Sequence, residues 1–190
     1  MSARSYLDDR DAAVIAAVVD RLVPPLGVHP GASALGAVDY IDGTLGAFAV
    51  DPPRIWAGGP FSGRHGGEAG FAEFTPLTRL EELAWRTRIE GSCGMAEREF
   101  NGPTRGWQEI YRDGIAALGH DFCEVGHDEQ ERRLLVQREL RDVLYGHACE
   151  GAYGAPEYGG NPDLAGWRVI GFDGDVQPRG YTDDEVTGRA

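Results

Sequence analysis

Two groups of residues in this chain have the types and spacing needed for site chemistry. The first is His120, Cys123 and His127, which would share one face of a helix. Imidazole and thiolate both bind zinc, so this group predicts a metal site in a stand-alone metal- or thiol-dependent enzyme. Two features weigh against that hypothesis: Gly119 and Gly126 interrupt a helix on both sides, and a structural zinc site needs a fourth ligand.

The second group is His147, Cys149 and Glu150, which has the composition of a thiol nucleophile beside a base. Residues two positions apart do not face each other on a helix, so we expect His147 to be a core or surface residue. The chain contains no GxSxG, HExxH or P-loop sequence, and no GxGxxG after an expected strand. We therefore expect neither a catalytic residue set nor a cofactor site in this chain.

Helices must position these residues, because apolar side chains recur at helical spacing along most of the chain. We predict an all-α fold of about five helices in one domain, residues 1–174, with long loops rich in glycine and proline. The expected helices span residues 8–23, 33–49, 75–91, 102–118 and 128–148. The polar, acidic residues 175–190 are expected to form a flexible tail.

Particular residues predict where the helices start and which faces they bury. Asp8 or Asp9 is expected to cap the first helix and Thr75 the third, and Asp128 with Glu131 forms a capping box for the fifth. The expected core face of the third helix consists of Leu77, Leu80, Leu83 and Ala84.

The last helix leads into a stretch that mixes glycine with aromatic residues, within residues 145–174. The glycines argue against a regular helix, and the aromatic residues argue against disorder. Asn161 precedes Pro162 and suits the N-cap of a short turn that ends near Gly166, whereas the alternation over 167–172 predicts extended chain. Two roles stay open for this C-terminal hook: a loop that covers its own core, or a surface presented to a partner.

The charge of the chain excludes several classes of partner. Eighteen basic residues, all of them Arg, against 31 acidic ones give a net charge of −13. Such a chain suits neither nucleic acid nor an anionic membrane surface, and no window is long and apolar enough to span a bilayer. The absence of Lys also excludes Schiff-base chemistry and Walker-type phosphate binding.

Residues 51–70 form a connection rich in proline and glycine, in which Trp56 and Phe61 are expected to pack on the helices or on a partner. Three cysteines, Cys93, Cys123 and Cys149, form no CxxC pair, and their odd number leaves at least one thiol unpaired within the chain. Residues 1–12 contain neither a twin arginine nor an apolar segment. The chain as written therefore predicts a cytoplasmic protein, exported only if a partner carries the signal or if the chain was trimmed.

Several short strings stand out in and around the hook: Glu150-Gly151, Pro156, Tyr158-Gly159-Gly160-Asn161, Gly166-Trp167 and Ile170-Gly171-Phe172. Weaker strings near the start are Leu22-Val23-Pro24, Pro30-Gly31-Ala32 and Tyr40-Ile41-Asp42. Together they resemble the signature of the gluconate 2-dehydrogenase subunit 3 family, over roughly residues 7–173.

The resemblance implies a small, cofactor-free subunit that binds, stabilises and helps to mature a large flavoprotein. That partner would be an FAD-dependent sugar or alcohol dehydrogenase of the glucose–methanol–choline type, with a separate electron-acceptor subunit in some relatives. Family members usually begin with a twin-arginine export signal, which residues 1–12 lack. The resemblance also makes an intersubunit disulfide through Cys149 conceivable. The partner-interface residues that we expect are Tyr153, Tyr158, Gly159, Gly160, Asn161, Trp167, Trp56, Phe61 and Cys149.

Overall fold

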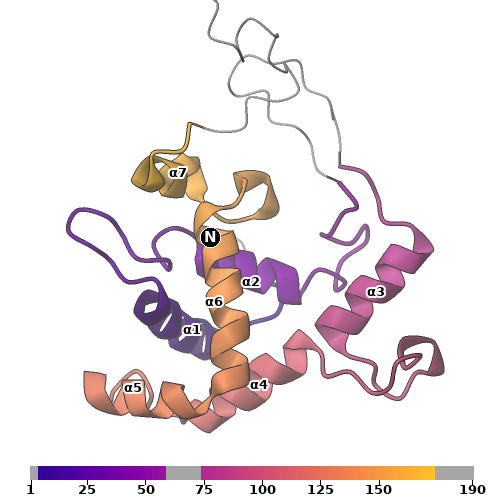
Figure 1. Ribbon diagram of the computed structural model, residues 1–190, viewed down its shortest axis with the longest axis horizontal. Coiled ribbons are helices and arrows are strands. Elements are labelled where there is room, and N and C mark those ends of the chain that lie inside the picture. Colours follow the sequence, from indigo (N-terminus) through magenta and orange to yellow (C-terminus); the bar gives the residue numbers. More distant parts are fainter. Residues whose placement is uncertain (1–3, 59–73, 174–190) are drawn as a thin grey trace, which may run out of the picture.

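The computed structural model describes residues 4–58 and 74–173, and these form an all-α fold (Figure 1). The α-helices are α1 (Asp9–Leu22), α2 (Ala37–Leu45), α3 (Arg79–Glu90), α4 (Trp107–Leu118), α5 (His127–Val136), α6 (Arg138–Tyr153) and α7 (Ala165–Ile170). Short 3-10 turns lie at Ala96–Arg98, Pro156–Tyr158 and Pro162–Leu164. Two isolated bridges are the only β-pairing in these ranges. The all-α prediction is confirmed, with seven α-helices in the described residues instead of about five. The expected tail at 175–190 lies outside the described residues.

Helix α6 occupies the middle of the fold and contacts α1, α2, α4, α5 and α7 (Figure 1). Its closest neighbour is α2, and Gly151 explains how near the two backbones come. A Cβ at Gly151 would lie 2.7 Å from the Cα of Ala37 and 2.9 Å from the Cβ of Tyr40. Only glycine leaves room for this approach. The core around α6 is apolar and includes Ile15, Val18, Leu35, Ile41, Tyr111, Leu140 and Leu144.

The positions at which the helices start agree with the sequence-based predictions only in part. Asp8 caps α1, and its Oδ1 accepts a hydrogen bond from the backbone nitrogen of Asp11 at 2.7 Å, as expected. Helix α3 begins later than expected, because the backbone of Thr75 pairs with that of Gly58 and is not free to cap a helix. Thr78 is the cap instead.

The capping box expected at Asp128 is also absent, because Gly126 is the N-cap of α5 and Asp128 already lies inside the helix. The single helix expected over 128–148 is two helices, since the chain bends at Gln137, where φ is −94° and ψ is 59°. Leu134 and Leu140 are both buried, yet their spacing of six would place them about 120° apart around a straight helix. The bend lets both side chains reach the same core.

The orientation of α3 is the largest departure from the expected core. Ile89 is the single buried residue of this helix. Leu80 is 75% exposed, Ala84 is exposed as well, and Leu83 is half-buried. None of the four residues of the expected core face is fully buried, and Leu77 is half-buried like Leu83. The opposite face, with Trp85 and Ile89, packs on the fold.

The segment after Gly166, expected to be extended, is the short helix α7. Alternation over six residues is a weak signal, and the inward packing of Trp167 decides the conformation. The helix ends at Gly171 with a positive φ of 67°, and the backbone nitrogen of Phe172 donates to the carbonyl of Trp167 at 2.9 Å. This closure is a common way to end a helix and requires glycine at its left-handed position.

Candidate partner interface

Because α6 extends to Tyr153, the hook comprises residues 154–173. It folds back over the C-terminal end of α6, and glycine permits the close fit. A Cβ at Gly160 would overlap the carbonyl oxygen of Gly151, and a Cβ at Gly166 would overlap that of Ala152. Gly159 has a φ of 101°, a conformation that favours glycine, and it is exposed. Sequence patterns identified these glycines as shaping a loop, and the structure shows which backbone atoms each of them approaches.

Asn161 holds the hook together from inside. Its side chain donates from Nδ2 to the carbonyl of Gly154 at 2.9 Å, and its Oδ1 accepts from the nitrogen of Gly166 at 2.7 Å. Its backbone nitrogen lies 2.9 Å from the carbonyl of Leu35 and 2.7 Å from that of Gly151. These hydrogen bonds fix the hook to α6. The residue is 0% exposed, so it offers no surface to a partner.

Trp167 has a similar internal role. It is 6% exposed, and its Nε1 donates to the carbonyl of Tyr153 at 2.7 Å. The ring of Phe172 packs edge-on against it, with ring centres 4.9 Å apart. Tyr153 is itself half-buried against the core. Asn161 and Trp167 were expected at the partner interface, but the structure buries both, because the hook needs them to close over α6.

Tyr158 differs from these residues because it points outward, next to Trp56. Trp56 stacks on Phe74 with ring centres 3.9 Å apart, and Tyr158 lies 6.1 Å from Trp56 and 5.8 Å from Phe74. We call Trp56, Phe74 and Tyr158 the aromatic cluster. Tyr158 is 45% exposed, and the other two rings are partly exposed. The cluster thus joins the segments on both sides of residues 59–73 to the hook, although the two are far apart in sequence.

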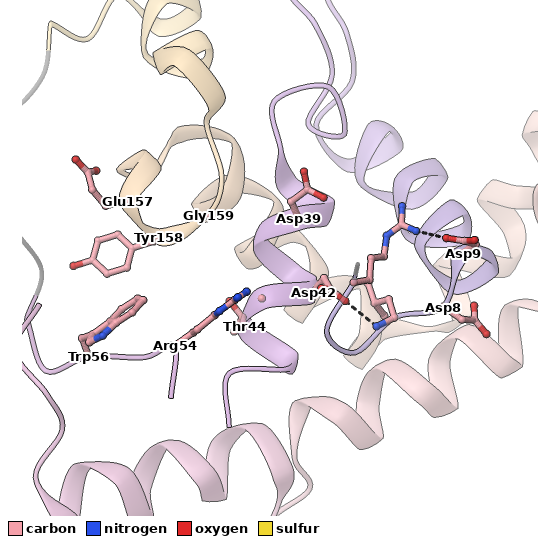
Figure 2. A pocket seen from close by; sticks show the side chains of 13 residues that line it. Asp8, Asp9, Asp39, Asp42, Thr44, Arg54, Trp56, Glu157, Tyr158 and Gly159 are labelled. Atoms are coloured by element: carbon pink, nitrogen blue, oxygen red, sulfur yellow. Dashed lines mark hydrogen bonds and ion pairs between the residues drawn. The ribbon is translucent and has the colours of Figure 1, made fainter. Parts of the chain in front are cut away.

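The aromatic cluster borders a wide cleft of about 1040 Å³ (Figure 2). Trp56 and Tyr158 lie side by side at one end of it, and Asp8 and Asp9 lie at the other. Carboxylates outnumber guanidinium groups along its wall, which also contains Arg54. The cleft is therefore acidic, with its aromatic side chains at the rim.

Asp42 forms part of the cleft wall, but backbone hydrogen bonds within the fold occupy its carboxylate. Its carboxylate accepts hydrogen bonds from the backbone nitrogens of Ser5, Tyr6 and Leu7 at 2.7–2.9 Å, so it ties the start of the chain to α2. Burial raises the pKa of this carboxyl, but the backbone N–H groups outweigh burial and leave the pKa below its usual value. Asp42 therefore stays ionised as a structural anchor.

His147 is a core residue and does not activate a thiol. It is buried on α6, with Nδ1 2.8 Å from the hydroxyl of Tyr111 and with the ring of Trp107 edge-on at 4.4 Å. Burial, with a smaller contribution from the charge of Arg88, lowers the pKa of His147 to about 4. Nearby, the hydroxyl of Tyr40 donates to Glu150 at 2.8 Å. His147 and Glu150, the two residues grouped with Cys149 in the sequence, thus both have structural partners.

The other sequence-based site does not assemble. His120, Cys123 and His127 are all exposed, around the turn between α4 and α5. In the described part of the chain, no group of three His, Cys, Asp or Glu residues is placed to hold a metal ion. The intervening chain is not helical, because Gly119 and Gly126 flank it, and so the three side chains never share one face. These three residues therefore give a metal-dependent enzyme no assembled site in the described part of the chain.

Two residues predicted at the partner interface remain, Cys149 and Phe61. Cys149 is half-buried on α6, and the three cysteines carry free thiols. The predicted intersubunit disulfide stays a prediction. Phe61 lies outside the described residues. Sequence reasoning missed Phe74, whose only signal was its place among other aromatic residues after a glycine-rich connection.

Comparison of the chain with protein-family models, with curated proteins and with solved structures finds no match. Within residues 4–58 and 74–173, no helix has both the length and the apolar character that crossing a bilayer requires.

Proposed function

We propose that this chain is the small, non-catalytic subunit of an oxidoreductase complex whose large subunit is an FAD-dependent sugar or alcohol dehydrogenase. The resemblance of the hook to the gluconate 2-dehydrogenase subunit 3 family motivates the choice of partner. In this proposal the flavin of the large subunit takes the hydride, and this chain supplies no cofactor. An additional subunit would accept the electrons.

The observation that carries the proposal is the aromatic cluster. Trp56 and Tyr158 are about a hundred positions apart in sequence, yet the fold brings their rings to 6.1 Å on one partly exposed surface. Tyrosine and tryptophan are the residue types that most often anchor protein interfaces. An exposed cluster of them beside a cleft fits a docking surface better than a surface with no partner.

The closed hook explains how this surface keeps its shape. Asn161 and the nearby glycines fix the backbone that carries Tyr158, so the anchor is largely preorganised before binding. A chain that binds only the folded large subunit stabilises it by mass action, and this accounts for an accessory role in stability and maturation.

The test is binding of the flavoprotein by two matched tyrosine variants. We expect Tyr158→Ala to weaken the complex by about 2 kcal/mol, or roughly thirtyfold in Kd. Tyr145→Ala is the control, because Tyr145 is 54% exposed on α6 and lies outside the aromatic cluster. If both variants bind as tightly as the unaltered chain, the cluster is not the interface.

A further inference from the structure

The cleft beside the aromatic cluster has an excess of negative charge of its own. Five carboxylates and two guanidinium groups line it. Arg4 forms an ion pair with Asp9, which leaves Arg54 beside the other four carboxylates. The charge of this surface is therefore negative locally, independently of the net charge of the whole chain.

The carboxylates are spread along the cleft and do not converge on one point. Figure 2 shows Asp8 at one end, Asp39 and Asp42 on α2 in the middle, and Glu157 at the aromatic end. In the part of the chain that the structure describes, no three acidic side chains are placed to hold one metal ion. Separated charges fit a ligand with several cations, such as basic side chains along a peptide.

The aromatic end of the cleft complements the rest of a basic side chain. Trp56 and Tyr158 line the cleft and also belong to the aromatic cluster. Lysine and arginine pack their apolar stems along such rings and place their cations over the ring faces. The fold contains one contact of this kind, since the guanidinium of Arg86 stands 4.2 Å from the centre of the Phe48 ring.

The walls of the cleft are fixed by contacts within the fold. Asp42 holds the backbone of residues 5–7, and Asn161 holds the hook that contains residues 157–159. A Cβ at Gly43 on the cleft wall would meet no atom within 4 Å, so the space beside α2 is open. A preformed cleft needs little ordering of its own residues to bind a flexible segment.

We propose that the cleft receives a basic segment, carrying lysine or arginine, of the large flavoprotein subunit. This inference rests on the proposed function and names the chemistry of the partner surface next to the aromatic cluster. Two observations select this occupant. Trp56 and Tyr158 belong to both surfaces, so a partner that docks on the aromatic cluster also lies against the cleft. The excess of carboxylates in the cleft attracts a basic part of that partner.

The test compares two matched aspartates. Asp39 and Asp128 are both exposed in the first turn of their helices, α2 and α5, so replacement by Lys changes the net charge and the helix-dipole interaction alike. Asp39 lines the cleft and Asp128 does not. In dilute salt we expect Asp39→Lys to raise the Kd for the flavoprotein at least about tenfold, and Asp128→Lys less than about threefold. The difference should shrink in about 1 M salt, where the Debye length falls to about 3 Å.

Crosslinking locates the bound segment, because this chain contains no Lys. A zero-length carbodiimide joins a carboxylate to a lysine amine, so each crosslink from an acidic side chain of this chain to a lysine reaches another protein. We expect Asp8 and Asp39 to crosslink to the large subunit. Crosslinks confined to carboxylates outside the cleft, such as Asp128, would overturn the proposal.

The outcomes separate this inference from the proposed function. If the complex forms and Asp39→Lys binds as tightly as Asp128→Lys, the cleft proposal is wrong while the proposed function stands. If spermine binds the isolated chain, Asp39→Lys abolishes that binding and spermine leaves the complex intact, the cleft is a site for a small cation and the proposal is wrong. If no flavoprotein complex forms, the proposed function fails and the cleft proposal fails with it.

Discussion

The Oδ1 of Asn161 accepts a hydrogen bond from the backbone nitrogen of Gly166 at 2.7 Å, and this contact closes the hook over α6. The same side chain donates to the carbonyl of Gly154 at 2.9 Å. One buried amide thus joins the start of the hook to the start of α7. The shape of the surface that carries Tyr158 depends on this single side chain.

Replacing Asn161 by Ala should destabilise the protein by about 1–3 kcal/mol, because it leaves the buried backbone nitrogen of Gly166 and the partly buried carbonyl of Gly154 without this partner. Urea unfolding measures the change. Asn101→Ala is the control, since Asn101 is exposed in the connection before α4. Equal stabilities of the two variants would contradict this role of Asn161 and would show that water satisfies the two backbone groups in its place.

Two glycines should respond to the same substitution with opposite signs. Gly160→Ala should destabilise the fold by about 1–3 kcal/mol, since its Cβ would overlap the carbonyl of Gly151. Gly146→Ala should stabilise it by about 0.5–1 kcal/mol, because Gly146 lies within α6 and a Cβ there meets no atom within 4 Å. Thermal unfolding of both variants tests this contrast, and a shift of the same sign in both would contradict it.

His147 should make the stability depend on pH. Its pKa is about 4 in the folded chain and 6.5 when unperturbed, so the unfolded chain binds a proton that the folded chain excludes between these values. The free energy of unfolding should therefore fall as the pH drops from 6.5 toward 4, by up to about 3 kcal/mol.

The matched variant for that measurement is His147→Gln, which keeps a hydrogen-bond acceptor for Tyr111 but does not titrate. Urea unfolding of the unaltered chain and the variant, at the two ends of this pH window, separates His147 from the carboxylates. A variant with the same pH dependence as the unaltered chain would mean that His147 is accessible to protons in the fold.

Periodicity predicted most of the helices but not which face of each meets the core. Helix α1 agrees closely with expectation, because Asp8 is a strong cap and the apolar stripe is regular. For α3 the leucines were the stronger hydrophobic signal, yet Trp85 and Ile89 face inward. Propensity and pattern describe a single helix, whereas the choice of face depends on neighbours that only the three-dimensional fold defines.

Residue types in the hook predicted a loop shaped by glycine, with Asn161 as the N-cap of a short turn. Sequence could not separate its inner from its outer residues, because Trp167 and Tyr158 are both aromatic and both neighbour glycines. The difference in their exposure arises from contacts between residues distant in sequence. Trp167 donates a hydrogen bond to the carbonyl of Tyr153, whereas Tyr158 packs near Trp56, about a hundred positions away. His120, Cys123 and His127 failed as a group for a related reason, since their spacing implies one face only on a continuous helix.

The most direct measurement is an absorbance spectrum of the tagged protein purified from its native host, together with the masses of the chains that accompany it. We expect a yellow complex with flavin absorbance and one larger chain that retains the flavin. That larger chain should dissociate more readily from Tyr158→Ala than from Tyr145→Ala. A colourless preparation containing this chain alone, under conditions that preserve weak complexes, would contradict the assignment to a flavoprotein oxidoreductase.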